Sequence, residues 1–346
     1  MGDLIRYAIV GLGRAGWDIH VAMLRSRPDM RIVGVVDPEP SRVDQAVREF
    51  SCQPASSLDH ILTMPGIDVV VLATPSRHHA DEAIACLSAG KHVVVEKPMA
   101  MSVAESDRMI EAAHQSQRHL FINQSYRYRP ELLHLKAILA SGVLGRIFHV
   151  RHNTTSFTRR NDWQTLSKFG GGLLNNTGAH YIDFTLQLLP GRVTEVMGDL
   201  QQIASAGDVE DHVKALLRTD ARATADIEIT MAENLPANLP KWTLCGTTGT
   251  AVSDGKTTTL RYFDPRQAPP IQPIEGAAPD RRYGNDDILP WQEKMVSAAD
   301  YAEVSLYDNV HGVLRGTDKI FVTPESVRDG IRVMEMIRNS SSRFTA

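Results

Sequence analysis

Near the start of the sequence, a glycine-rich turn lies between an apolar run and a helical pattern. Gly11-Leu12-Gly13-Arg14-Ala15-Gly16 follows the apolar residues 7–10, and residues 17–25 can continue as a helix. In a GxGxxG turn, Gly11 allows the sharp bend, Gly13 lets a pyrophosphate approach the backbone, and Gly16 lets the helix pack closely on the strand. The free N–H groups at the start of the helix receive the phosphates. In this setting the motif predicts a binding site for a nicotinamide or flavin dinucleotide at residues 11–16.

An acidic residue at the end of the next apolar run indicates which dinucleotide is bound. The run over residues 32–36 ends in Asp37, which lies 21 positions after Gly16. A carboxylate there can accept hydrogen bonds from the adenosine ribose hydroxyls, and it repels a 2′-phosphate. NAD is therefore expected rather than NADP. Arg42, five residues on, is the nearby group that could soften this preference, and it also suits a surface position on the following helix.

Strand and helix patterns alternate over the first third of the chain. Helices are expected at residues 41–50 and 80–89, and strands at 67–72, 92–98 and from 120 onward. Ser102 and Glu105 form a capping-box pattern that opens another helix. Strands that are apolar almost throughout are typical of a parallel sheet covered on both faces. Residues 1–124 are thus predicted to form a doubly wound Rossmann domain of the α/β class.

The pattern changes after about residue 145. Apolar and polar residues alternate strictly over residues 223–231, which indicates a strand with one buried and one more polar face. Further strands are expected at 147–155, 193–200, 211–218, 242–245 and 258–263, with a turn at 246–249. The proline-rich segment 268–282 reads as an exposed loop, and two helices end the chain, the last opened by Thr323-Pro324.

These patterns predict that residues 125–346 form an α+β domain with a large open, mostly antiparallel sheet. The sequence offers no obvious second layer of helices to cover both faces of that sheet. A homodimer or homotetramer formed through the open face is therefore expected.

Composition excludes several classes of protein. The chain is 42% apolar and 23% charged with a formal charge of −4, so nothing favours nucleic acid as a partner. No apolar stretch approaches the roughly 18 to 20 residues needed to span a membrane. The three cysteines show no CxxC pairing and suit a reducing compartment, so a cytoplasmic location is expected. The histidines show no metal-ligand spacing, and no metal site is predicted.

Two segments carry the candidate chemistry. Lys97 ends an apolar strand between Glu96 and Pro98, and ligands of open parallel sheets lie beyond the carboxyl ends of the strands. Thr74-Pro75 closes the preceding strand and is expected at the same edge. If residues 174–188 form a helix, its polar residues share one face, namely Asn176, His180, Asp183 and Gln187. Imidazole titrates near neutral pH and suits proton transfer, although a lone histidine beside an aspartate is more often a solvated or capped pair.

The glycine motif, the stretch Ala89-Gly90-Lys91-His92-Val93 leading into Glu96-Lys97-Pro98, and residues 170–183 together resemble the Gfo/Idh/MocA family. This is the family of glucose–fructose oxidoreductase and inositol dehydrogenase. The resemblance covers nearly the whole chain and implies NAD(P)-dependent oxidation or reduction of a hydroxyl on a sugar, sugar derivative or cyclitol. It also implies a C-terminal domain whose open sheet mediates dimers or tetramers.

By resemblance, Lys97 is the active-site lysine and His180 the proton donor or acceptor. Arg127 matches an arginine segment that enters the crevice, and Asp162-Trp163 matches a loop that borders the substrate. The expected cofactor contacts are residues 11–16, Asp37, Arg42, Thr74, Pro75, Glu96 and Lys97. The expected substrate contacts are Lys97, Arg127, Trp163, Asn176, His180 and Asp183.

Asn176 departs from the family pattern, because many members carry aspartate four residues before the histidine. Asparagine can bond a hydroxyl but cannot take up a proton. Proton transfer should then rest on His180, which Asp183 would orient if the two are within reach. Two other functions remain open, a non-catalytic NAD-binding regulator and a reductase of a C=N or C=C bond.

Overall fold

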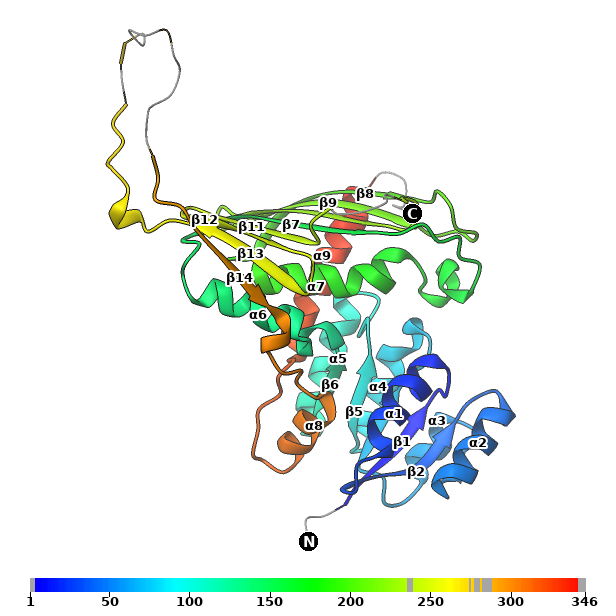
Figure 1. Ribbon diagram of the computed structural model, residues 1–346. Coiled ribbons are helices and arrows are strands. Elements are labelled where there is room, and N and C mark those ends of the chain that lie inside the picture. Colours follow the sequence, from blue (N-terminus) through cyan, green and yellow to red (C-terminus); the bar gives the residue numbers. More distant parts are fainter. Residues whose placement is uncertain (1–3, 235–238, 274, 277–280, 282–287, 342–346) are drawn as a thin grey trace.

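The first sheet of the protein consists of six parallel strands in the order β3-β2-β1-β4-β5-β6 (Figure 1). The computed structural model describes residues 4–234, 239–273, 275–276, 281 and 288–341. The six strands are β1 Ile5–Val10, β2 Met30–Val36, β3 Gln53–Pro54, β4 Val69–Leu72, β5 His92–Glu96 and β6 Leu120–Asn123. This strand order confirms the predicted Rossmann sheet, with the order reversing between β1 and β4.

Helices connect the parallel strands, as the alternating pattern predicts. The glycine turn leads into a π-helical segment, η1 Ala15–Val21, which continues as α1 Ala22–Arg25. The other connecting helices are α2 Pro40–Phe50, α3 Leu58–Thr63, α4 His79–Ser88 and α5 Val103–Ser116. Ser102 caps α5 as expected by accepting from the Glu105 N–H at 3.1 Å. The Glu105 carboxylate accepts from Met101 N rather than from the cap residue, so the capping box is only half formed.

The second sheet has eight strands in the order β14-β13-β12-β11-β7-β10-β9-β8. All neighbours are antiparallel except β10 and β7, which confirms a large, mostly antiparallel sheet. Its strands are β7 Ile147–Thr155, β8 Val193–Gln201, β9 His212–Thr219, β10 Thr224–Thr230, β11 Trp242–Gly246, β12 Gly249–Ser253, β13 Thr257–Tyr262 and β14 Gln292–Ser297.

The sequence patterns missed two strands of this sheet. β12 begins at Gly249, the last residue of the expected turn, and is only five residues long. β14 is an edge strand with a mostly exposed, polar sequence. Neither offers a clear period of two. The described residues of the expected loop 268–282 contain no helix or strand, and residues 274, 277–280 and 282 of that loop lie outside the described chain.

One face of the second sheet is covered by helices on the side of the Rossmann domain (Figure 1). These are α6 Pro130–Ala140, α7 Ala179–Leu188 and α9 Pro324–Ser340. The helix expected over residues 174–188 is present, but its first turn is π-helical, η6 Leu174–Gly178. Thr323 caps α9 as predicted, with Pro324 in the first position. No helix of the described residues lies over the other face in this view.

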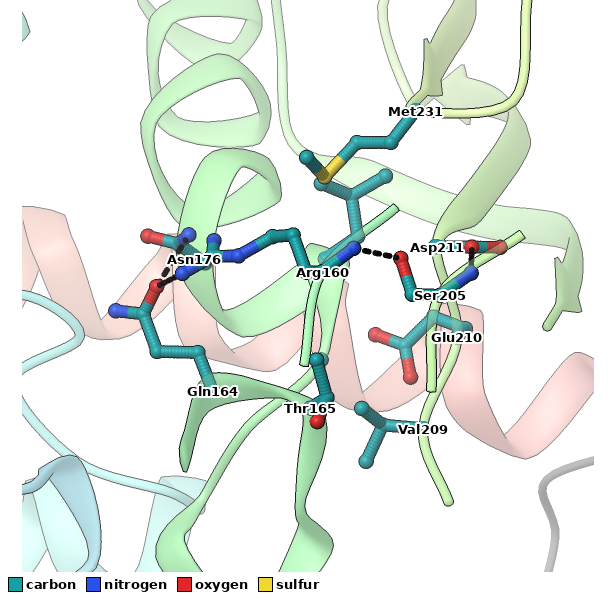
Figure 2. Close-up of a pocket in the computed structure, with 11 residues that line it drawn as sticks. Arg160, Gln164, Thr165, Asn176, Ser205, Val209, Glu210, Asp211 and Met231 are labelled. Atoms are coloured by element: carbon teal, nitrogen blue, oxygen red, sulfur yellow. Dashed lines mark hydrogen bonds between the residues drawn. The ribbon is translucent and has the colours of Figure 1, made fainter. Parts of the chain in front are cut away.

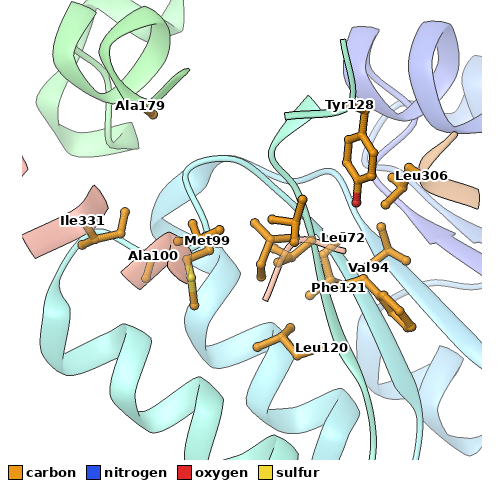
Figure 3. Close-up of a cluster of buried hydrophobic side chains, with 14 of the residues drawn as sticks. Leu72, Val94, Met99, Ala100, Leu120, Phe121, Tyr128, Ala179, Leu306 and Ile331 are labelled. Carbon is orange, nitrogen blue, oxygen red and sulfur yellow. The ribbon is translucent and has the colours of Figure 1, made fainter. Parts of the chain in front are cut away.

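The helix α8, Leu306–Leu314, returns from the second sheet to the Rossmann sheet. The ring of Tyr307 packs edge-on against Tyr7 of β1, with centroids 5.6 Å apart. Figure 3 shows Tyr128 and Leu306 near Val94 of the central strands. The buried apolar side chains of both sheets therefore form one continuous core. None of the helices in the described residues is long and apolar enough to cross a membrane.

Candidate active site

Two of the three glycines in the glycine turn have no room for a side chain, whereas the space over the third is free. Gly11 has a φ of +91°, and a Cβ there would lie 2.6 Å from the carbonyl oxygen of Ala73. A Cβ on Gly16 would lie 1.9 Å from the carbonyl oxygen of Gly11. At Gly13 a Cβ would meet only the Arg42 guanidinium, at 4.0 Å. The space over Gly13, in front of the first N–H groups of η1, therefore fits the pyrophosphate of a dinucleotide.

Asp37 is held at the end of β2 by backbone donors. Its carboxylate accepts from Leu12 N at 2.6 Å and from Glu39 N at 2.9 Å. Arg42 lies 3.3 Å away and is half exposed, whereas the Asp37 side chain is nearly buried. The fixed carboxylate suits the ribose hydroxyls, and Arg42 is the cation that a 2′-phosphate would meet.

The buried His79 joins the loops that follow β4 and β5. Its two ring nitrogens lie 2.9 Å from the carbonyl oxygen of Thr74 and 2.8 Å from that of Pro98. Thr74 in turn donates to Glu82 at 2.5 Å. The Thr74-Pro75 and Lys97-Pro98 segments thus meet at the carboxyl edge of the sheet, as the strand order requires, and the peptide bond between Lys97 and Pro98 is cis.

Lys97 reaches from this edge to the first turn of the helix that ends in α7. Its Nζ donates to the main-chain oxygen of Asn176 at 3.0 Å and to Oδ1 of the same residue at 2.9 Å. Burial lowers the pKa of Lys97 to about 8. The neighbouring Glu96 opposes this shift, whereas Arg14 and Arg160 add to it. Near neutral pH the ammonium is charged but loses its proton more readily than an ordinary lysine.

Beside Lys97 lies a buried carboxylate with several donors. Glu96 accepts from the Lys97 N–H at 3.1 Å and from Asn123 Nδ2 at 2.7 Å, and His20 Nε2 lies 3.0 Å away. The other nitrogen of His20 is 2.8 Å from the Tyr307 hydroxyl. Burial alone raises the pKa of Glu96, but the hydrogen bond and charge of His20 and the bond from Asn123 lower it to about 2. Sequence reasoning missed this network, and the available signal was a carboxylate that ends a buried strand.

His180 lies against an aromatic ring and a cation. Its ring stacks on Tyr126 with centroids 4.0 Å apart and an interplanar angle of 11°. The Arg129 guanidinium covers the Tyr126 ring at 3.9 Å. The Nδ1 atom of His180 is buried and has no hydrogen-bond partner among the described residues. Burial, reinforced by the charge of Lys97, holds the pKa of His180 well below its usual range, so the imidazole is neutral at pH 7.

Arg127 and Asp183 bind each other. Arg127 Nε donates to Asp183 Oδ2 at 2.8 Å, and a second guanidinium nitrogen donates to Oδ1. Arg127 also donates to the hydroxyl of Ser326 at 2.6 Å. Both side chains are buried, with 6% and 2% of their surface exposed. No hydrogen bond joins Asp183 to His180 in the described structure; the carboxylate instead ties α7 to the Arg127 turn.

The loop that carries Trp163 borders Asn176 from the other side. Asn176 Nδ2 donates to Gln164 Oε1 at 3.0 Å, and Arg160 donates to the same oxygen. A small, partly open pocket lies beside these side chains, lined by Arg160, Gln164, Asn176, Ser205, Glu210 and Met231 among others (Figure 2). Trp163 itself is 43% exposed. The structure thus brings together Lys97, Asn176, His180 and two polar residues of the loop that the sequence did not single out.

Among the residues that the structure describes, no group of three His, Cys, Asp or Glu side chains is placed to hold a metal ion. At this candidate site the structure gathers the glycine turn, Lys97, Asn176 and His180.

Comparison with known proteins identifies both halves of the chain. Residues 5–124 match the model "Oxidoreductase family, NAD-binding Rossmann fold", and residues 132–252 match the model "GFO/IDH/MocA C-terminal domain". The N-terminal domain is thus an NAD-binding Rossmann domain.

Individual relatives are similar over much of the chain. A 1-carboxy-3-chloro-3,4-dihydroxycyclohexa-1,5-diene dehydrogenase of Comamonas testosteroni is 29% identical over 64% of this chain and 57% of its own length. A putative UDP-kanosamine synthase oxidoreductase subunit of Amycolatopsis mediterranei is 30% identical over 71% of this chain and 74% of its own. The WlbA dehydrogenase of Bordetella pertussis, solved with NADH and UDP-GlcNAcA, superposes with a TM-score of 0.79 at 25% identity, covering 99% of this chain and 96% of that one.

Proposed function

The chain belongs to the Gfo/Idh/MocA family of oxidoreductases, and from this premise we propose that it transfers hydride between NAD and a secondary hydroxyl or ketone of a hydroxylated ring. The substrate is a sugar, a sugar derivative or an inositol-like cyclitol. Residues 1–124 bind the cofactor, and residues 125–346 supply the substrate site and the subunit contacts.

The observation that carries the proposal is the pairing of a charged lysine with a neutral histidine at the mouth of the cofactor cradle. With a pKa of about 8, Lys97 is mostly cationic near pH 7, while His180 is unprotonated. A neutral imidazole can accept the hydroxyl proton, and an ammonium stabilises the alkoxide that develops. When bound, NAD supplies the hydride acceptor at its nicotinamide.

Asn176 completes the site by bonding a substrate hydroxyl, since its amide can donate and accept but cannot ionise. The exposed Trp163 offers an apolar face on which a sugar ring can stack. The relatives support a hydroxylated ring, because their names carry a dihydroxylated cyclohexadiene, a UDP-kanosamine and a UDP-linked GlcNAcA.

A panel of sugars, sugar acids and cyclitols tests this function, with NAD or NADH present and the absorbance of the reduced cofactor followed. Turnover of a ring alcohol or ketone, lost on Lys97→Ala and His180→Ala, is the expected result. Turnover only with C=N or C=C compounds would make the protein a reductase of unsaturated substrates. Tight NAD binding with no turnover of any compound would support a regulator instead.

We further propose that the protein is a homodimer or homotetramer joined through the uncovered face of the second sheet. One row of paired residues crosses all eight strands, and its apolar members Met197, Leu216, Val252 and Met295 are exposed. Large apolar side chains exposed on an uncovered sheet face are typical of subunit interfaces. Sedimentation at micromolar concentration that showed only the 38.2 kDa species would contradict this assembly.

A cytoplasmic location belongs to the same proposal. Cys52, Cys86 and Cys245 all carry free thiols, and the first two are buried. Unpaired buried thiols suit a compartment in which glutathione keeps cysteines reduced.

A further inference from the structure

A chain of hydrogen bonds connects the active-site lysine to the surface loop of Trp163. Lys97 Nζ donates to Asn176 Oδ1 at 2.9 Å, and Asn176 Nδ2 donates to Gln164 Oε1 at 3.0 Å. Arg160 donates to the same Gln164 oxygen and binds Asp162 through Nε at 2.9 Å. Figure 2 shows the Asn176 and Arg160 side chains both directed at the Gln164 oxygen.

In each of these hydrogen bonds the donor and the acceptor are fixed. A guanidinium only donates hydrogen bonds, so Arg160 requires an oxygen at the end of the Gln164 side chain. That oxygen in turn accepts only an N–H, so the nitrogen of the Asn176 amide must face Gln164. The Asn176 oxygen is then left to face Lys97.

This arrangement matters most when Lys97 is unprotonated. A neutral amine has a lone pair and could accept a hydrogen bond from an amide N–H, whereas an ammonium can only donate. A free Asn176 amide could turn over and bond either form. An amide held by Gln164 presents only its oxygen, which favours the charged form of the lysine.

We propose that Gln164 is a positioning residue, which Arg160 orients, and that it holds the Asn176 amide with its oxygen toward Lys97 Nζ. The importance of this for catalysis rests on the proposed function, in which the charge of Lys97 stabilises the alkoxide. The positioning itself does not depend on the substrate.

Other charged groups also face Lys97 and set the background for this effect. Glu96 precedes it on the strand and favours the ammonium, whereas Arg14 of the glycine turn and Arg160 of the loop disfavour it. His180 lies on α7 close enough for its pKa to be lowered by the charge of Lys97. None of these four side chains is altered in the variants below.

The test measures the ionisation of Lys97 directly. The whole protein without substrate is labelled with trace acetic anhydride over a range of pH, and acetylation of Lys97 is followed by mass spectrometry, with the exposed Lys136 as internal reference. Gln164→Met, which keeps the length but removes the acceptor, should lower the pKa of Lys97 below its value of about 8. Gln164→Glu keeps an oxygen for both Asn176 and Arg160 and adds a negative charge, so it should raise that pKa.

Two controls separate positioning from a general effect on the loop. Gln202→Met removes a glutamine whose Nε2 donates to the backbone oxygens of Ser205 and Gly207, and it should leave the titration of Lys97 unchanged. In an Asn176→Ala background the amide is absent, so Gln164→Met should produce no further shift.

An unchanged titration of Lys97 in a folded Gln164→Met protein would overturn the proposal. So would a shift of the same size in the Asn176→Ala background, because the effect would then bypass the amide. Since labelling needs no turnover, a protein that shows these shifts but oxidises no ring alcohol would retain the positioning role and lose the proposed function.

Discussion

The helix formed by η6 and α7 carries two residues that each bind a buried or partly buried cation, and the two contacts differ in kind. Asn176 accepts from Lys97, and Asp183, seven residues later, accepts from Arg127. The Arg127 pair is buried and saturated, because a two-pronged carboxylate contact and the hydroxyl and carbonyl of Ser326 occupy its guanidinium. The Lys97 pair is partly exposed and joins a cation to a neutral amide.

The difference between the two pairs shows how one helix can contribute both to the stability of the fold and to the reactivity of the site. A buried guanidinium needs an opposite charge and full hydrogen bonding, since an unpaired buried charge is costly. An amide does not cancel the charge of Lys97, so burial can lower the pKa of that lysine to about 8. We therefore expect the saturated Arg127–Asp183 pair to contribute mainly to the free energy of unfolding. The Lys97–Asn176 pair, which we call unsaturated because an amide does not neutralise the cation, should affect mainly the reaction rate.

The largest effect is expected from breaking the saturated pair. Arg127→Ala leaves the Asp183 carboxylate buried without its partner and should lower the free energy of unfolding by about 3–5 kcal/mol. Urea denaturation at pH 7 measures this loss. Replacing both members, Arg127→Met with Asp183→Leu, should recover most of the stability, because no buried charge remains. A stable Arg127→Ala protein that has lost turnover would instead place Arg127 in the substrate site, as the family resemblance implied.

Lys97 of the unsaturated pair and the neighbouring His180 should show the opposite behaviour. Lys97→Ala and His180→Ala should each lower turnover about 10²-fold or more, or about 2.7 kcal/mol, with little change in unfolding. The affinity for NAD, measured by titration of the apoprotein, should change by less than about tenfold. If His180→Ala keeps near-normal turnover across pH, another group carries the proton.

A smaller effect is expected from giving the unsaturated Lys97–Asn176 pair a carboxylate like that of the saturated Arg127–Asp183 pair. Asn176→Asp places a carboxylate where the amide oxygen lies 2.9 Å from Lys97 Nζ, and an opposite charge favours the ammonium. In the oxidative direction Lys97 must be charged, so activity should fall as the pH rises through its pKa of about 8. The variant should move this alkaline limb upward by about 1 pH unit. A limb that does not move would show that the charge of Lys97 does not control the rate.

The smallest effect concerns the cofactor site, where the nearly buried Asp37 carboxylate and the half-exposed Arg42 guanidinium form a third pair. NAD should bind at least about tenfold more tightly than NADP, a difference of about 1.4 kcal/mol. Asp37→Ala should narrow this gap, because it removes the repulsion and frees Arg42 for a 2′-phosphate. Adding Arg42→Ala should reverse the gain in NADP affinity. Tighter binding of NADP to the unaltered protein would show that Arg42 dominates.

Local patterns predicted much of the fold because they report on nearby residues. The strand at residues 147–155 has the predicted bounds, and the capped helix after Thr323 begins where expected. The helix at 174–188 is present as well, although nothing in its spacing revealed the π-helical first turn. β12 and β14 escaped prediction because a short strand and a polar edge strand have no strong period of two.

The polar face of that helix shows what such patterns cannot predict. Spacing placed Asn176, His180 and Asp183 on one side, but it could not say what each would meet. The partners of these side chains are distant in sequence, and hydrophobic periodicity contains no information about contacts between distant segments.

The Rossmann fold, the glycine turn and the position of Lys97 at a strand end follow from the amino-acid sequence alone. These depend on short-range spacing and on the fixed edge where parallel strands terminate. The three-dimensional packing alone reveals that Lys97 bonds Asn176, 79 positions away. It likewise reveals that His20 joins Glu96 to Tyr307, which lies 287 positions after His20. Burial imposes these partnerships, because each polar group that leaves water must find a donor or acceptor in whatever segment the fold brings beside it.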